Sequence, residues 1–305
     1  MPEKSTTLFQ IRKMIYRSPL ELMNDEPMDQ IFDLGQYPIQ DLENPASKEL
    51  IAQCQEELKT LGCAVIRNFV KAESLQRMLS EADRLMDQTY WASLTHNPYF
   101  TKEDHLIPED HPKRFFQNRS SGFINSDLLE EESDLNKIFY SKVLLDFISE
   151  CLQISPLYCW ADPLGNHPYS VMDDEHYFPW HFDGNDFTVS ILVQQAEQGG
   201  DFEYVPNIRT SDDENFEGVN KILNGFREGV QSLSLRPGDM QIFMGRYSIH
   251  RVTKVSGRRK RIIALPTYST DPLTMNRPEH SKQIYGRALP IHYEREAHRI
   301  DTLTD

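Results

Sequence analysis

Hydrophobic and polar residues follow two different patterns along this chain. From residue 47 to residue 61, apolar side chains recur every three or four positions behind a serine, and Gly62 follows. This spacing predicts an amphipathic helix that is capped by the serine and ends at the glycine. A short strand at 63–66 and a second amphipathic helix at 72–88 are predicted next.

The second half of the chain has the pattern of short strands separated by turns. Residues 89–130 lack a period and are rich in His, Pro, Asn and aromatic residues, so we expect a long loop region that lines a binding site. A charged excursion with a short helix is expected at 207–229. The predicted strands cover residues 167–172, 177–183, 187–194, 201–205, 232–235, 239–244, 248–252 and 261–268. Roughly eight short strands after two helices predict a mainly β fold with flanking helices, an antiparallel barrel or jelly roll.

The length of 305 residues allows one substantial core. We expect a single domain over 1–305, with an N-terminal helical and loop region at 1–156 that packs on the barrel. The barrel core with its site would occupy 157–270, and 271–305 would be a C-terminal extension. Residues 1–45 are expected to wrap the surface.

Composition narrows the class of protein. The formal net charge of −15 disfavours binding to nucleic acid or to an anionic membrane, because both would be repelled. No apolar run approaches the roughly 18–20 residues of a membrane span. The first 17 residues lack a secretory pattern, and the four cysteines form no CxxC pair, so we expect a cytoplasmic protein with reduced thiols. Nothing in the sequence indicates an oligomeric state.

A metal site is predicted by His181 and Asp183, two positions apart at the end of the predicted strand 177–183. Residues i and i+2 of a strand project from the same face, so both side chains can reach one metal ion. His250, in the predicted strand 248–252, can supply a third ligand. Two histidines and one carboxylate leave three octahedral positions open, which is typical of Fe(II) oxygenases. Two of these positions suit a bidentate 2-oxo acid and one suits dioxygen.

A His-x-Asp or His-x-Glu pair is weak evidence when it stands alone. With 10 His and 47 acidic residues, roughly one or two such pairs arise by chance. His292 and Glu294 form another, in the polar C-terminal region. The alternative interpretation is that His181 and His250 are ordinary histidines of a barrel. The strand context and a following arginine favour the metal site.

That arginine belongs to the basic run 258–261, which leads into the predicted strand 261–268. The run could be a nuclear-localisation or polyanion-binding patch. Because it enters a strand, however, Arg259, Arg261 and Thr267 would share an inward face. A buried arginine needs an anionic partner, and the distal carboxylate of 2-oxoglutarate can pair with it in a bidentate manner. We expect Arg261, deeper in the strand, to bind the co-substrate, with Arg259 as the second candidate.

Four stretches together resemble a known superfamily. They read WHFDGNDFTVSILVQ, GGDFEYVPNIR, RPGDMQIFMGRYSIHRVTKV and RRKRIIALPTYS, within residues 162–269. The chain is similar here to Fe(II)/2-oxoglutarate-dependent oxygenases, and most to bacterial members that act on free amino acids and similar small metabolites. The resemblance implies a double-stranded β-helix (a jelly roll, cupin-like) and implies His181, Asp183 and His250 as iron ligands and Arg261 as the co-substrate anchor.

The resemblance also bears on the reaction. Related radical halogenases have a small residue at the position of Asp183, where chloride binds iron, so the aspartate implies hydroxylation. We expect Fe(II), 2-oxoglutarate and dioxygen as cofactors, a small-molecule substrate from specialised metabolism, and release of succinate and carbon dioxide. Desaturation, cyclisation or epimerisation with the same cofactors remains an alternative. Two further alternatives are a protein hydroxylase and a non-catalytic metal-binding barrel.

Three residues outside the metal set are candidates for contact with the substrate. Arg119, in the predicted loop region, could bind a substrate carboxylate. Tyr177 lies on the side of His181 if the strand is regular, and Thr267 shares the face of Arg261. Each could equally be a solvated or packing residue. The excursion 207–229 could act as a lid.

Overall fold

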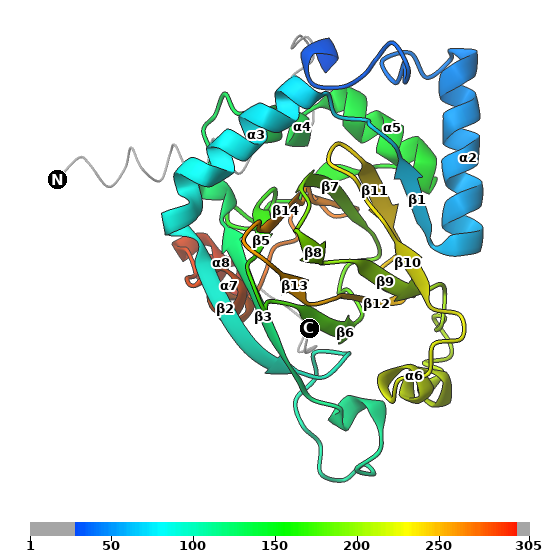
Figure 1. The fold of residues 1–305 in the computed structure, drawn as a ribbon, viewed down its shortest axis with the longest axis vertical. Coiled ribbons are helices and arrows are strands. Elements are labelled where there is room, and N and C mark those ends of the chain that lie inside the picture. The colour runs from blue at the N-terminus through cyan, green and yellow to red at the C-terminus, as the bar shows by residue number, and fades with distance from the viewer. Residues whose placement is uncertain (1–27, 298–305) are drawn as a thin grey trace, which may run out of the picture.

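The computed structural model describes residues 28–297 (Figure 1). Our expectations for residues 1–27 and 298–305 lie outside the described residues. The helices are η2 (Met28–Gln30), α2 (Pro45–Leu61), α3 (Ala72–Leu85), η3 (Met86–Gln88), η4 (Pro112–Arg114), η5 (Ser126–Leu128), α4 (Asp134–Phe139), α5 (Lys142–Leu152), α6 (Phe216–Leu223), α7 (Pro278–Tyr285) and α8 (Pro290–Ala297).

Two sheets contain most of the strands. The larger sheet has the order β1-β11-β7-β14-β5-β3-β2 and the smaller one β10-β9-β12-β6, with antiparallel pairing throughout. The strands are β1 (Cys63–Ile66), β2 (Tyr90–His96), β3 (Gln117–Ile124), β4 (Tyr158–Cys159), β5 (Tyr169–Met172), β6 (Phe178–His181), β7 (Thr188–Gln194), β8 (Gln198–Gly199), β9 (Phe202–Val205), β10 (Gln231–Leu233), β11 (Met240–Phe243), β12 (Ile249–Val252), β13 (Val255–Ser256), β14 (Arg261–Ala264) and β15 (Tyr268–Ser269).

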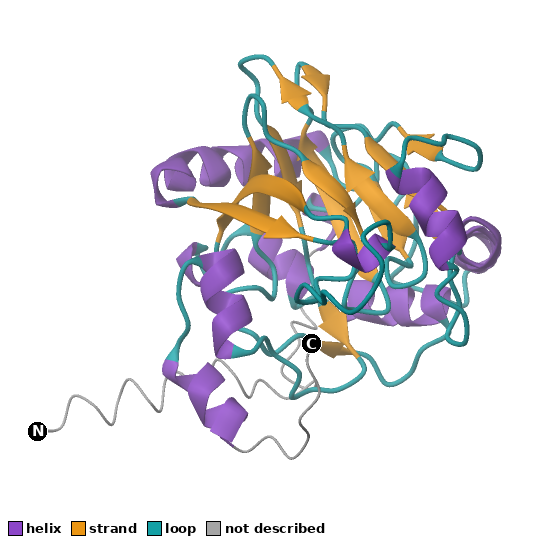
Figure 2. Cartoon of the chain, turned by 90° about the horizontal axis from the view of Figure 1, so that it is seen from below, coloured by secondary structure: helices purple, strands orange, loops and turns teal. Residues whose placement is uncertain are grey.

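From β5 onward the main strands alternate between the two sheets. β5, β7, β11 and β14 lie in the larger sheet, whereas β6, β9 and β12 lie in the smaller one. The chain therefore winds as a double-stranded β-helix, and the prediction of a mainly β jelly roll with flanking helices is confirmed. In Figure 2 the strands form the centre of the molecule and the helices lie around them.

The helices before the barrel cover the outer face of the larger sheet. Met78 of α3 and Phe147 of α5 are buried in one apolar core with Ile191, Ile242 and Ile262 of β7, β11 and β14. In Figure 1, α2, α3 and α5 lie along the upper and right-hand edges, and α6 lies at the lower right. Burial of this sheet face is the main apolar contribution to the fold.

The first predicted helix is present, but its cap differs from the prediction. Asn44, not a serine, is the cap, and its side chain accepts a hydrogen bond from the amide of Ala46. Ser47 lies inside α2 and donates to the carbonyl of Pro38. Gly62 ends the helix with φ 63°, and its amide donates to the carbonyl of Leu58. A left-handed residue at this position favours glycine.

The prediction of a long loop region at 89–130 is wrong in its main feature. The segment forms a β2–β3 hairpin, and β3 pairs with β5 to extend the larger sheet. Only residues 97–116 form the long connection. The buried positions of β2 include Ala92 and His96, and those of β3 include Arg119 and Ser121. Because these side chains are small or polar, the hydrophobic alternation that would reveal the strands is missing.

The excursion at 207–229 contains α6, as expected, and packs on the smaller sheet. Val219 and Ile222 of α6 form an apolar cluster with Trp180 and Ile249, from the outer faces of β6 and β12. Trp180 is therefore a packing residue.

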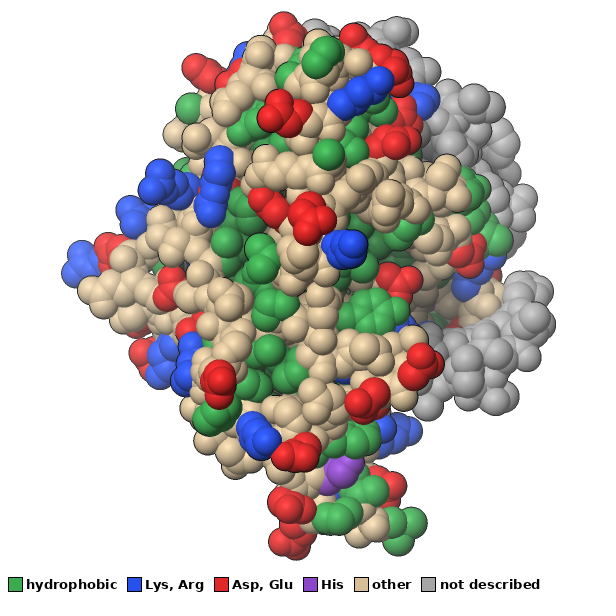
Figure 3. Space-filling model, turned by 90° about the vertical axis from the view of Figure 1, so that its right-hand side faces the viewer, with side chains coloured by type: hydrophobic (Ala, Val, Ile, Leu, Met, Phe, Trp, Pro, Cys, Tyr) green, Lys and Arg blue, Asp and Glu red, His purple; other side chains and the backbone are tan. Residues whose placement is uncertain are grey.

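One face of the molecule mixes charged, polar and apolar side chains (Figure 3). On the face shown in Figure 3, acidic side chains alternate with basic and apolar ones. Across residues 28–297, none of the helices combines the length and apolar character that a membrane crossing requires.

Candidate metal centre

His181, Asp183 and His250 converge at one end of the smaller sheet. His181 ends β6 and lies opposite His250 of β12 in the strand register. One ligand atom from each of the three side chains lies within 4.8 Å of the other two. The Nε2 atoms of His181 and His250 are 3.7 and 3.4 Å from Oδ1 of Asp183. The three residues that the sequence singled out thus lie together, although β6 ends at His181 and Asp183 follows the strand rather than belonging to it.

The two imidazoles have the orientation that a metal site needs. Nδ1 of His181 lies 2.9 Å from the carbonyl oxygen of Pro179, and Nδ1 of His250 lies 3.0 Å from that of Ser248. A carbonyl can only accept, so each Nδ1 carries the proton and each Nε2 has a free lone pair directed to Asp183. A backbone carbonyl behind the ring is the usual support of a metal-bound histidine. This donor set fits Fe(II).

The carboxylate of Asp183 is held by its surroundings. Its amide donates to the carbonyl of Gly245, and its Oδ2 accepts a hydrogen bond of 2.9 Å from the hydroxyl of Thr188. A Cβ atom at position 245 would lie only 1.9 Å from Oδ2, so glycine is needed there. Burial alone would raise the pKa of Asp183, but the pKa is lowered overall, and the hydrogen bond from the Thr188 hydroxyl and the charge of Arg119 act in that direction.

β6 contains an irregularity that changes its inner face. His181 pairs with His250, but Phe178 pairs with Val252, so β6 has one extra residue between the two pairs. This β-bulge brings Phe178 to the side of His181, and the two rings stack at 3.7 Å and 8°. The sequence-based placement of Tyr177 on that side assumed a regular strand and is wrong. Tyr177 lies outside β6 and forms an isolated bridge with Ser120.

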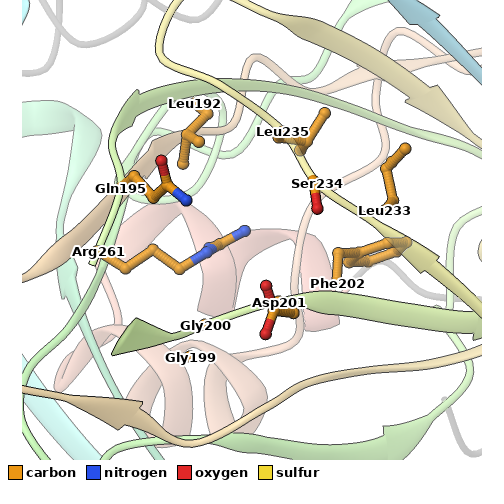
Figure 4. A pocket seen from close by; sticks show the side chains of 10 residues that line it. All are labelled: Leu192, Gln195, Gly199, Gly200, Asp201, Phe202, Leu233, Ser234, Leu235 and Arg261. Carbon is orange, nitrogen blue, oxygen red and sulfur yellow. The ribbon is translucent and has the colours of Figure 1, made fainter. Parts of the chain in front are cut away.

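Arg261 lies in a small cavity between the sheets (Figure 4). Its guanidinium points across the cavity, which Asp201, Phe202 and Ser234 also line. The side chain is buried, yet within residues 28–297 it makes no hydrogen bond or ion pair. Burial lowers the pKa of Arg261 to about 10, and Asp201 opposes this effect. A Cβ atom at Gly200 would approach its Cδ to 2.9 Å, so the glycine makes room for the arginine.

Two other predicted residues are engaged elsewhere. The exposed Arg259 donates to the carbonyls of Gln195 and Ala196. Thr267 lies beyond the end of β14, where its hydroxyl donates to the carbonyl of Leu265. The inward face predicted for 259–267 therefore holds for Arg261 but not for the ends of the run.

Arg119 lies near the metal centre on the inner face of the hairpin. Its Nε donates to the hydroxyl of Ser121, and its guanidinium stacks on Phe178 at 4.1 Å. The side chain is only 3% exposed, and its terminal nitrogens have no partner among the described residues. Burial lowers the pKa of Arg119 to about 10, whereas the charge of Asp183 acts in the opposite direction. This arginine has an unfilled capacity to bind an anion.

The loop 97–116 reaches the metal centre, where the ring of Phe100 meets that of His181 edge-on at 5.8 Å. The sequence did not predict that this loop would be ordered around one residue. Asn97 is fully buried; its Nδ2 donates to the carbonyls of Thr101 and Lys113, and its Oδ1 accepts from the amide of Tyr99. The amide of Phe182 donates to the carbonyl of Pro98, which ties the loop to the metal-binding turn. Single asparagines of this kind carry no recognisable sequence signal.

Several solved structures are similar to this chain. The chain is similar to a 2OG-Fe(II) oxygenase family oxidoreductase from Burkholderia pseudomallei, at 13% identity and a TM-score of 0.46 over 72% of this chain and 91% of that one. A prolyl-4-hydroxylase from Pseudomonas putida matches at 12% identity and 0.44, over 71% and 97% of the two chains. The alpha ketoglutarate dependent epimerase SnoN from nogalamycin biosynthesis matches at 11% identity and 0.49, over 73% and 83%.

These similarities are too low to show which reaction the chain catalyses. No curated protein matches the chain. The family comparison is stronger, because residues 46–285 match the family described as Halogenase D. That segment includes the helices before the barrel, both sheets and all three residues of the metal centre. This chain therefore belongs to the Halogenase D family.

Proposed function

We propose that this protein hydroxylates an unactivated C–H bond of a free amino acid, with Fe(II), 2-oxoglutarate and dioxygen, and releases succinate and carbon dioxide. The proposal rests above all on His181, Asp183 and His250, whose ligand atoms converge with both Nε2 lone pairs free. These residues would hold the iron. Iron and 2-oxoglutarate supply the oxidising chemistry, and the protein determines which C–H bond lies near them.

Arg261 would bind the distal carboxylate of 2-oxoglutarate. Its guanidinium is buried in a cavity between the sheets and has no partner among residues 28–297. A buried cation without a partner is unfavourable, so an anion that enters the cavity relieves this penalty. Bidentate pairing would also fix the direction in which the co-substrate extends.

Arg119 would bind the substrate carboxylate. Among the described residues it is the second buried arginine with free donors, and the charge of Asp183 favours its charged form. A side chain that is only 3% exposed suits a small free acid better than a segment of a folded protein. This supports an amino acid or a close derivative as the substrate.

Asp183 supports hydroxylation rather than halogenation, although the family is named for a halogenase. The residues around it are arranged to hold a carboxylate, with a hydroxyl donor at Thr188 and a glycine at 245. The carboxylate would fill the iron position at which a halogenase needs chloride. The proposal includes one domain over 1–305, since residues before 157 supply β1, β2 and β3 to the larger sheet.

A panel assay tests the proposed function. The full chain is reconstituted anaerobically with Fe(II), then mixed with 2-oxoglutarate, chloride and single amino acids under air. We expect one or a few amino acids to stimulate succinate formation and to gain one oxygen atom by mass spectrometry. Chlorine in place of hydrogen would overturn the hydroxylase assignment, and loss of two hydrogens would indicate desaturation or cyclisation. Stimulation by no amino acid would overturn the substrate class.

A further inference from the structure

We propose that His96 accepts a hydrogen bond from the amino group of the substrate, and so makes the site selective for free amino acids over other small carboxylic acids. The inference rests on the proposed function and adds a second recognition residue to Arg119. His96 ends β2, and no sequence pattern singles it out.

The first observation is an unsatisfied buried nitrogen. His96 is 7% exposed, and its Nδ1 lies 2.9 Å from the carbonyl oxygen of Asn97, so Nδ1 carries the proton. Nε2 is then an acceptor, and it is buried without a hydrogen-bond partner among the described residues. A buried acceptor that lacks a donor is unfavourable by about 1–3 kcal/mol, which a ligand with a suitable N–H group would relieve.

The second observation is the position of the ring beside the metal centre. The imidazole of His96 stacks on Phe100 at 4.2 Å and meets the rings of Phe178 and His181 edge-on, at 5.8 and 6.3 Å. His96 itself is not one of the three residues whose ligand atoms converge. Its free nitrogen therefore lies in the surroundings of the iron site without being needed to bind the metal.

The third observation is the relation of His96 to Arg119. His96 lies opposite Gln117 in the hairpin, and Arg119 lies opposite Leu94, so the two residues are diagonal neighbours on the same inner face. Side chains in this relation can reach two groups of one small molecule. Arg119 can only donate, whereas the free nitrogen of His96 can only accept. An α-amino acid presents the matching pair, an accepting carboxylate beside a donating ammonium.

The state of the imidazole is consistent with this role. Burial lowers the pKa of His96 to about 4, and the charge of Arg119 acts in the same direction. The ring is therefore neutral near pH 7 and keeps its acceptor.

The test uses the amino acid identified in the panel and its analogue that lacks the amino group. His96→Phe keeps an aromatic ring against Phe100 but removes the acceptor. A hydrogen bond to a charged group contributes about 1.5–3 kcal/mol, so we expect the KM for the amino acid to rise about 10- to 150-fold. The KM for 2-oxoglutarate and the turnover of the analogue should not change. His96→Gln, which restores an acceptor, should recover part of the loss.

Two controls separate the possible outcomes. His167→Phe removes another buried imidazole, one that stacks on Phe139 at 4.6 Å, and should leave both KM values unchanged. If His96→Phe does not fold, the wild-type protein still decides: it should prefer the amino acid over the analogue by about tenfold or more in kcat/KM. Equal kcat/KM values for the amino acid and its analogue, or an unchanged KM in folded His96→Phe, would overturn the role of His96. The proposed function would not be affected by either result. If the wild-type protein oxidises no amino acid, the proposed function fails first.

Discussion

Replacing Gly245 by alanine tests whether Asp183 holds the metal. The new Cβ would lie 1.9 Å from Oδ2 and 2.6 Å from Cγ of Asp183, whereas ordinary contact begins at 3.4 Å. The carboxylate must therefore retreat by about 1.5 Å, and metal-ligand distances in proteins tolerate only about 0.2 Å. Neither Oδ1 nor the hydrogen bond from Thr188 can stay in place after such a movement.

We expect Gly245→Ala to weaken Fe(II) binding about 10- to 100-fold, which corresponds to about 1.4–2.7 kcal/mol. Anaerobic isothermal titration calorimetry with Fe(II), in the presence of 2-oxoglutarate, measures this directly. Gly184→Ala is the matched control, because a Cβ there would meet nothing within 4 Å and the residue is adjacent to Asp183. Wild-type affinity in Gly245→Ala would refute the assignment of Asp183 as a ligand.

Three further predictions concern the rest of the site and the fold. Arg261→Lys should raise the KM for 2-oxoglutarate about tenfold or more and leave the KM for the amino acid unchanged, because lysine cannot pair in a bidentate manner; equal changes in both would contradict the assignment. Asn97→Ala should loosen the loop 97–116, because it removes every side-chain hydrogen bond of that buried residue, and limited proteolysis should cut the variant there sooner than the wild type. Burial lowers the pKa of His167 to about 3. The neutral, buried ring therefore stabilises the fold fully above the unfolded pKa of about 6.5, and this stabilisation is lost as the pH falls below 6.5. His167→Phe should therefore reduce the decline in the free energy of unfolding between about pH 7 and pH 4 by roughly 3 kcal/mol, measured by urea denaturation; an unchanged decline would show that His167 is not buried in its neutral form.

The metal centre could be predicted from the sequence because it depends on simple geometry. His181 and Asp183 are two positions apart at the end of a strand, and His250 belongs to a strand that the pattern also reveals. The buried Arg261 follows from the same alternation. The double-stranded β-helix is recognisable because its strands are short, apolar and separated by turn residues.

The surroundings of the centre were harder to predict, for two physical reasons. The bulge in β6 shifts the alternation by one residue, so Phe178 replaces Tyr177 beside His181, and only the pairing with β12 reveals it. The β2–β3 hairpin turns His96 and Arg119 inward, so it lacks the apolar pattern by which strands are recognised. A site that binds a polar ligand needs polar inward residues, and these same residues hide the strands that carry them.

The stoichiometry of a single reaction shows whether hydroxylation is coupled to the decarboxylation of 2-oxoglutarate. Succinate and oxidised amino acid are quantified in the same sample, from the full chain with Fe(II), 2-oxoglutarate and the best substrate of the panel. We expect one succinate for each hydroxylated product, and neither compound when Asp183 is replaced by alanine. Hydroxylated product without succinate, or undiminished turnover in Asp183→Ala, would contradict this expectation.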